Sequence, residues 1–411
     1  MVYDVEAITL FAGAGSYAEA KSVYTEGRNS CKSSTSRRSL QGFVSEATYT
    51  KKLKGTAFGC SFTSSPCGPS EDAMRVGLGS GRLALAGNFW DKFITEALDG
   101  TGDFAGKSDA MRKTAVKKGV LGVLTMYSAY ELESAIAKAF NNETADTQAA
   151  HAWDEGWAFL YGSHHKDGGK FGAWEFTMKR DSDFCVDAQN QATAAMEGKT
   201  TVLRYFMAGQ KASREGDVAA MVAARNDIYR VFALSSIRAA LKYSALIQYS
   251  SSGVAKYSDE YHMEAYAYFL AAAGWIEQAS PKAGEEVLAL LDFKKSESQL
   301  TASVYCEVRA KLVAAFAGLG LDCDLVGDWK GHNSTVLPCT STTATCPAKT
   351  TVPEGISYTP TDSSASVGTN TDCGAAFITT TVTLETATSR APSTAAGAAL
   401  ILAALSSLLA A

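Results

Sequence analysis

The stretch His151-Ala-Trp-Asp-Glu-Gly-Trp-Ala-Phe-Leu-Tyr161 combines three potential ligand side chains with a dense aromatic setting. Read as a helix, it places His151, Asp154 and Glu155 on one face, because residues three and four apart are neighbours on a helix surface. The aromatic residues between them are typical of a helix packed against an interior. The stretch therefore predicts a helix that presents one imidazole and two carboxylates together.

The same pattern returns 109 residues further along, in Glu260-Tyr-His-Met-Glu-Ala-Tyr-Ala-Tyr-Phe-Leu270. Glu264 takes the position of Glu155 and Glu260 that of His151, so His-x-x-x-Glu becomes Glu-x-x-x-Glu. The long helical pattern that precedes each copy matches at the same offset. The repeat predicts one duplicated unit that folds as two helical bundles related by pseudo-symmetry.

Helical periodicity dominates the chain to about residue 320, and strand-like alternation is almost absent. Helices are expected over about 1–30 with a break near Gly13, and over 83–98, 108–140, 151–161, 184–212, 216–249, 258–279, from Ser280-Pro281 onward, and 296–319. Asp146 and Ser258 are the expected N-caps of the two motif helices. We predict an all-α fold of two pseudo-repeated bundles followed by a stalk.

The domain boundaries follow from shifts in composition. The first repeat is expected at 1–165, a Gly- and charge-rich connector at 166–183, the second repeat with a C-terminal helix at 184–330, a Thr/Ser-rich stalk at 331–394 and an apolar end at 395–411. Stretches rich in Ser, Thr and Pro without periodicity do not bury a core. The stalk is therefore expected to stay extended or to carry glycan.

The composition excludes one class of partner and favours one compartment. The 411 residues carry a formal net charge of -5 without a basic patch, which argues against a nucleic-acid partner. The 9 cysteines form no C-x-x-C pair or zinc-finger spacing, so we expect disulfides and an oxidising compartment. Sequons at Asn142 and Asn333 predict a glycoprotein.

The two ends of the chain bear on its location. Residues 395–411 are apolar and uncharged and follow a polar Thr/Ser-rich spacer, which is the pattern of a glycosylphosphatidylinositol (GPI) attachment signal. A short C-terminal membrane helix is the alternative. The start, Met1-Val-Tyr-Asp-Val-Glu, has neither a basic nor an apolar region. Because a GPI protein must enter the secretory pathway, we expect that a signal peptide precedes this sequence in the gene.

Inward-facing carboxylates and imidazoles are how helical bundles hold iron or manganese. A single His and acid four apart is usually a solvated ion pair, and Glu260 also suits the positive end of its helix. The recurrence of an acid at the same place in both copies favours a metal site. Fe³⁺ prefers anionic oxygen, which the 17 tyrosines could also supply, several of them near the motifs (Tyr127, Tyr130, Tyr257, Tyr261 and Tyr266).

The run HAWDEGWAFLYG, with its Gly-rich connector and following Lys-Arg element, resembles the algal iron-assimilating proteins, also described as high-CO2-inducible periplasmic proteins. It is distantly similar to the imelysin-like helical proteins, whose motif places Glu three residues after His. The resemblance is strongest over about 85–290. It implies a duplicated all-helical fold, secretion to the cell surface or periplasmic space, and a role in iron uptake. Because Asp154 stands at that position here and Glu155 follows, which carboxylate binds stays open.

The function we expect is non-catalytic capture of iron, Fe³⁺ rather than Fe²⁺, at the extracellular face of the plasma membrane or in the periplasmic space. The expected ligands are His151, Asp154, Glu155, Glu260 and Glu264, with Tyr261 as an additional candidate. A carbonate anion that binds with the iron is left open. Two alternatives stand beside this expectation. One is a metal-dependent hydrolase, although no H-E-x-x-H or G-x-S-x-G motif occurs; the other is a surface adhesion or scaffold protein.

Overall fold

The computed structural model describes residues 1–33, 36–45, 89–145, 147–162, 172–184, 202–249, 256–301, 303–327 and 329. Within these ranges the regular structure is helical, and an isolated bridge joins Cys31 and Arg37. The predicted all-α class is confirmed. The expected stalk and apolar C-terminus lie outside the described residues.

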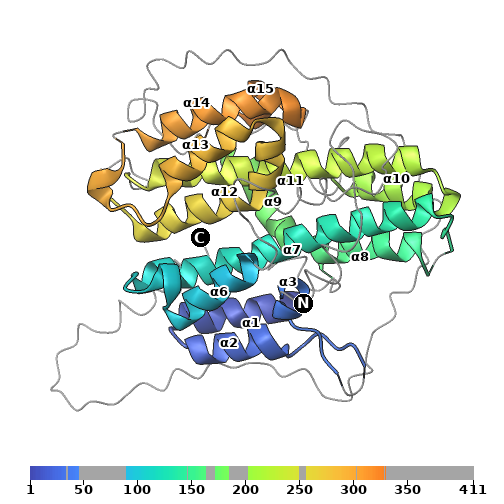
Figure 1. Cartoon of the computed structure of the whole chain (residues 1–411), viewed down its shortest axis with the longest axis horizontal. Coiled ribbons are helices and arrows are strands. Elements are labelled where there is room, and N and C mark those ends of the chain that lie inside the picture. Colours follow the sequence, from blue (N-terminus) through green and yellow to red (C-terminus); the bar gives the residue numbers. More distant parts are fainter. Residues whose placement is uncertain are drawn as a thin grey trace. The chain divides into compact units, whose positions relative to one another are not determined.

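Figure 1 labels the helices in chain order. They are α1 (Val2–Gly13), α2 (Tyr17–Glu26), α3 (Gln41–Val44), α6 (Phe89–Asp99), α7 (Asp109–Phe140), α8 (Ala149–Tyr161), α9 (Ala173–Phe184), α10 (Val202–Glu215), α11 (Val218–Leu246), α12 (Asp259–Ala279), α13 (Pro281–Leu291), α14 (Val304–Phe316) and α15 (Cys323–Val326), with 3-10 turns at Gly102–Phe104, Glu297–Gln299 and Ala317–Leu319.

Several helices begin where local chemistry predicts. The side chain of Ser108 accepts a hydrogen bond from the backbone of Met111 at the start of α7, and Ser258 accepts one from Tyr261 at the start of α12. Ser280 caps α13, whose first residue is Pro281. These caps satisfy backbone N–H groups that have no partner within the helix.

Two boundaries differ from the sequence prediction. The expected cap Asp146 lies outside the described residues, and α8 has Gln148 at its N-cap position without a side-chain hydrogen bond. The connector expected at 166–183 contains helix α9. No helix was predicted in this Gly- and charge-rich connector, but α9 itself holds no glycine or proline that would interrupt a helix.

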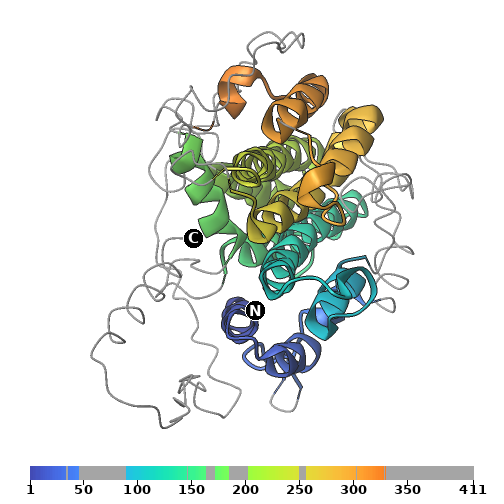
Figure 2. The same cartoon turned by 90° about the vertical axis from the view of Figure 1, so that its left-hand side faces the viewer.

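The long helices α7 and α11 pack against each other and against the two motif helices (Figures 1 and 2). Helix α7 lies along α8, α11 lies along α12, and α12 also packs on α7. Helices α7 and α11 begin at Asp109 and Val218, and α8 and α12 begin at Ala149 and Asp259. These starts fit an internal duplication, which itself remains an inference from the sequence.

Helix α8 is held by two close approaches. Ser128 Oγ donates to the Gly156 carbonyl at 2.7 Å, and a Cβ on Gly156 would meet the Leu132 side chain of α7 at 3.0 Å. On the other side, Trp153 is fully buried, and its Nε1 donates to the Phe206 carbonyl of α10 at 2.7 Å. A Cβ on Gly209 would lie 1.7 Å from Trp153 Cζ2, so only glycine fits there. These contacts fix which face of α8 looks outward.

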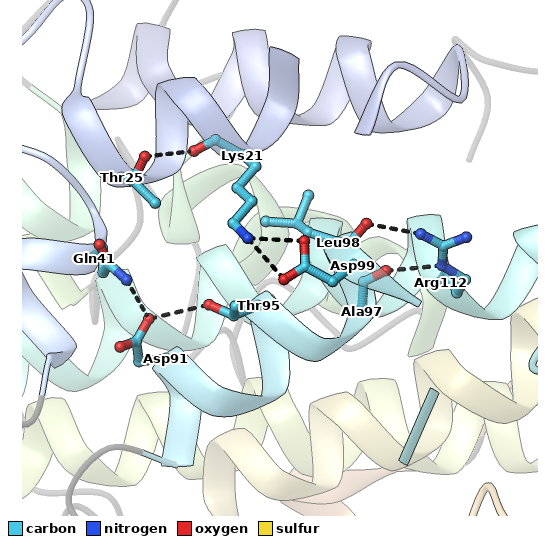
Figure 3. A network of polar contacts seen from close by, with 9 residues as sticks. All are labelled: Lys21, Thr25, Gln41, Asp91, Thr95, Ala97, Leu98, Asp99 and Arg112. Carbon is cyan, nitrogen blue, oxygen red and sulfur yellow. Dashed lines mark hydrogen bonds and ion pairs between the residues drawn. The ribbon is translucent and has the colours of Figure 1, made fainter. Parts of the chain in front are cut away.

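Helix α6 is anchored at its C-terminal end by charged side chains of α2 and α7 (Figure 3). Arg112 of α7 donates from Nε to the Ala97 carbonyl at 2.9 Å and from Nη2 to the Leu98 carbonyl at 2.7 Å. Lys21 of α2 forms an ion pair with Asp99 at 2.7 Å. A guanidinium at the last carbonyls of a helix satisfies acceptors that the helix leaves open.

In the part of the chain that the structure describes, no helix has both the length and the apolar character needed to cross a lipid bilayer.

Candidate functional site

The first motif presents its polar groups at the surface of α8. His151 Nε2 lies 3.5 Å from Glu155 Oε1, and the two side chains are 59% and 37% exposed. Asp154 is exposed and accepts a hydrogen bond from Gln210 Nε2 of α10 at 2.7 Å. Of the three predicted residues, His151 and Glu155 therefore form a pair, whereas Asp154 is held by α10.

Helix α7 adds two phenols and a carboxylate beside Glu155. Tyr127 and Glu131 are buried, Tyr130 is half-buried, and the two tyrosine rings lie 4.9 Å apart. Burial raises the pKa of both tyrosines, and the negative charges of Glu131 and Glu155 raise the pKa of each further. Both phenols therefore lie within the electrostatic reach of the same two carboxylates, one from each helix.

Glu131 is a residue that the sequence analysis did not select. It follows Tyr127 at the i+4 position of α7 and belongs to a different helix from the motif. The spacing Tyr-x-x-x-Glu within Tyr127-Ser-Ala-Tyr-Glu131 places both side chains on one face and could have indicated it. What the spacing could not show is that this face meets α8.

The carboxylates and the imidazole alone do not complete a metal site. Among the described residues, no group of three or more His, Cys, Asp or Glu side chains lies close enough together to hold a metal ion. The phenols of Tyr127 and Tyr130 are donors of a different type and extend the set. Two carboxylates, two phenols and one imidazole match the preference of a hard, highly charged cation for anionic oxygen and nitrogen ligands.

The second motif has a different environment. Glu264 is buried, and its Oε1 lies 2.6 Å from Lys118 Nζ of α7. Burial opposes the charge on Lys118, but the attraction of Glu264 outweighs it, so the pKa of Lys118 is raised. Glu260 and Tyr261 are half-buried nearby, and burial together with Glu260 and Glu264 raises the pKa of Tyr261. A metal ion at Glu264 would have to displace a buried ammonium group.

Further cations surround this ion pair. Lys117 is next to Lys118, whose charge is the largest cause of a lowered pKa of Lys117, about 8. Arg180 and Lys242 lie on the neighbouring helices α9 and α11, and Lys118 and Arg180 both act on the charge state of Tyr243. An additional cation would be repelled here. The two halves of the predicted metal site therefore differ. Helix α8 presents potential metal ligands, whereas α12 presents a carboxylate that is already paired with lysine.

His262 of α12 is buried and satisfied within the fold. Its Nε2 lies 3.1 Å from the Leu291 carbonyl and its Nδ1 lies 3.1 Å from the Tyr257 hydroxyl. Because a carbonyl only accepts, Nε2 carries the proton and Nδ1 accepts from the tyrosine. Burial lowers the pKa of His262 to about 4. This histidine is a packing residue.

A family model described as low iron-inducible periplasmic protein matches residues 1–349. The chain belongs to this family. The resemblance to iron-assimilating proteins is thereby confirmed. The family description links the chain to iron limitation and supports a role in iron assimilation and a periplasmic or extracellular location. No curated protein and no solved structure matches the chain.

Proposed function

We propose that this protein captures ferric iron outside the cell and delivers it for uptake, without catalysing a reaction. The observation that carries the proposal is membership of a family described as low iron-inducible and periplasmic. A protein made when iron is scarce must bind the ion tightly at low concentration. Fe³⁺ is the form that favours carboxylate and phenolate oxygens, which are the donors gathered beside α8.

We assign the capture site to the face between α7 and α8. His151 and Glu155 provide the outer pair, and Glu131 with Tyr127 and Tyr130 provides the inner donors. Glu155 is the preferred carboxylate because it acts on both tyrosines, whereas Asp154 is bound by Gln210. The raised phenol pKa values do not oppose this role, since a bound trivalent cation reverses the local charge and favours deprotonation.

The residues of the second motif take a smaller part in this proposal. Glu264 neutralises Lys118, and Glu260 and Tyr261 lie on the same helix as this pair. They would join the iron only if Lys118 moved away. We therefore propose one iron ion per chain, held by the first motif. A carbonate co-ligand, if bound, would complete the coordination from the solvent side.

We further propose that the protein is held at the outer surface by a GPI anchor attached near the apolar C-terminus. We also propose that Cys31, Cys306 and Cys323 form disulfide bonds, which would fit an oxidising compartment. Sequon Asn142 lies in the exposed turn after α7, where a glycan is sterically possible. Release of the protein from intact cells by a phosphatidylinositol-specific phospholipase tests the anchor; retention after treatment contradicts it.

Elemental analysis and visible absorption of the purified protein test the iron proposal. Protein loaded with Fe³⁺ and freed of excess metal should retain about one iron per chain and show a tyrosinate-to-iron charge-transfer band. Tyr127→Phe should weaken this band, whereas Tyr266→Phe, which alters a half-buried tyrosine beside Phe293, should leave it unchanged. No retained iron contradicts the function. Retained iron without the band contradicts the tyrosine assignment alone.

A further inference from the structure

Three cations from three helices surround the ring of Tyr243. Lys242 Nζ lies 5.3 Å from the ring centroid, Arg180 Cζ 5.6 Å and Lys118 Nζ 6.0 Å. Lys117 lies next to Lys118 on α7. We call Lys117, Lys118, Arg180 and Lys242 the cationic cluster; it lies where α7, α9 and α11 meet near α12.

Positive charge exceeds negative charge in the described part of this cluster. Glu264 pairs with Lys118 at 2.6 Å, and Asp183 pairs with Lys242 at 3.0 Å, so two carboxylates stand against four cations. Glu260 and Lys179 act on Lys117 with opposite signs. The lowered pKa values of Lys117 and Lys242 have the same origin, since neighbouring cations and burial disfavour the protonated form of each.

Arg180 has hydrogen-bonding capacity that the described protein does not use. The residue is 4% exposed, and within the described residues its Nε and Nη1 atoms have no hydrogen-bond partner, while the guanidinium also interacts with the Tyr243 hydroxyl. Its Nη2 lies 3.1 Å from Asp183 Oδ2, an ion pair without hydrogen-bond geometry. Buried donors without a partner are rare because each loses its bonds to water. Two such donors on one guanidinium, beside other cations, are arranged to receive an acceptor.

The chemistry of these groups selects an anion with several oxygens. A guanidinium binds two oxygens of one oxyanion in a fork, and ammonium groups add point charges around it. An excess of about two positive charges is matched by a dianion. A ligand could reach the cluster at the edge between α9 and α11, where the side chains of Lys242 and Asp183 are 19% and 22% exposed.

We propose that the cationic cluster is a binding site for a small dianionic oxyanion of the phosphate and sulfate type, held by Arg180, Lys242 and Lys118. The site is separate from the iron face, because its carboxylate Glu264 is paired with lysine and its centre is Tyr243 of α11. Binding would offset the repulsion among the cations and so stabilise the packing of α9 on α11. Oxyanion binding requires no metal ion, so it can be tested independently of iron capture.

The test uses the full chain after removal of metal by a chelator, with inorganic phosphate as the probe. Phosphate should raise the thermal unfolding temperature along a saturable curve, whereas chloride at equal ionic strength should not. Arg180→Lys keeps the charge but removes the fork, and should raise the phosphate Kd about tenfold or more. Lys242→Gln, a partly exposed position, should also raise the Kd. Lys282→Gln, whose side chain is 84% exposed on α13, is the matched control and should bind as the wild type does.

Three results would overturn the proposal. The first is an equal effect of chloride and phosphate, which would show only screening of the cations. The second is a linear, non-saturable response to phosphate. The third is an unchanged phosphate Kd in folded Arg180→Lys and Lys242→Gln, which would show that these side chains do not bind the phosphate.

Discussion

Lys118 Nζ lies 2.6 Å from Glu264 Oε1, and both side chains are about 95% buried. The lysine comes from α7 and the glutamate from the second motif on α12. A protein cation therefore occupies the place beside Glu264 where the sequence predicted a metal ion. The two motif copies therefore differ. The first presents potential metal ligands at the surface, and the second contributes a buried carboxylate whose charge is already balanced by lysine.

Breaking this pair should destabilise the fold strongly. Glu264→Gln leaves the Lys118 charge buried without its partner, and we expect a loss of about 3–5 kcal/mol in the free energy of unfolding. Urea denaturation at neutral pH measures it. The control is Glu215→Gln, which alters an exposed ion pair with Lys211 on α10 and should cost about 1 kcal/mol or less. An equal loss of unfolding free energy in the two variants would show that the buried ion pair stabilises the fold no more than an exposed one.

The double variant Lys118→Met/Glu264→Met removes both charges but keeps side chains of similar size, so it distinguishes the effect of the ion pair from that of packing. Replacement of a buried ion pair by apolar side chains is often neutral or stabilising, because the cost of desolvating both charges disappears. We expect the double variant to be more stable than Glu264→Gln, when both are compared by urea denaturation. A double variant that is less stable would mean that the charges themselves organise α7, α11 and α12.

Stability should fall in mild acid because of His262. Its pKa is lowered from 6.5 to about 4 in the folded protein, so the unfolded chain takes up the proton first. The contribution of neutral His262 to the free energy of unfolding is fully present above pH 6.5. It is lost as the pH falls from 6.5 towards 4, and the total loss is about 3 kcal/mol. His262→Gln should flatten the pH dependence of the unfolding free energy in this window. An unchanged slope in the variant would assign the effect to other groups.

Gly209 should be the most restrictive glycine of the α8–α10 contact. A Cβ at this position would lie 1.7 Å from Trp153 Cζ2, so Gly209→Ala must displace the indole, and overpacking of this kind costs about 1–3 kcal/mol or more. Gly13→Ala is the matched control, because nothing lies within 4 Å of its Cβ position. It should gain about 0.5 kcal/mol from the lower entropy of the unfolded chain. Thermal unfolding of both variants checks the contrast; a neutral Gly209→Ala would contradict the packing of α8.

Features that depend on neighbours in sequence could be predicted well. Ser258 caps α12 as expected, and Ser108 and Ser280 cap helices whose starts were expected there, because a cap involves only the next three residues. The cap expected at Asp146 is wrong, since Gln148 takes the N-cap position of α8. The pairing of His151 with Glu155 follows from helical spacing in the same way. Helix α9 was not predicted, because it lies in the segment 166–183 that composition marked only as a Gly- and charge-rich connector.

Features that depend on which helix faces meet could not be predicted. The repeat indicates that Glu155 and Glu264 occupy equivalent positions, but not that Lys118 of α7 forms an ion pair with Glu264. Nor does it indicate that Tyr127 lies within the electrostatic reach of both Glu131 and Glu155. The two equivalent glutamates therefore have different roles. Glu155, near tyrosines and a histidine, is a potential metal ligand, whereas Glu264 balances the charge of a buried lysine.

The most direct test of the account compares the Fe³⁺ affinity of Glu155→Gln with that of Glu264→Gln, using isothermal titration on variants that circular dichroism shows to be folded. We predict that Glu155→Gln weakens Fe³⁺ binding by about tenfold or more, equivalent to about 1.4 kcal/mol or more of binding free energy. Glu264→Gln should retain the affinity of the wild type, because its carboxylate is bound to Lys118. Loss of affinity in Glu264→Gln with wild-type binding in Glu155→Gln would contradict the account and move the iron to α12.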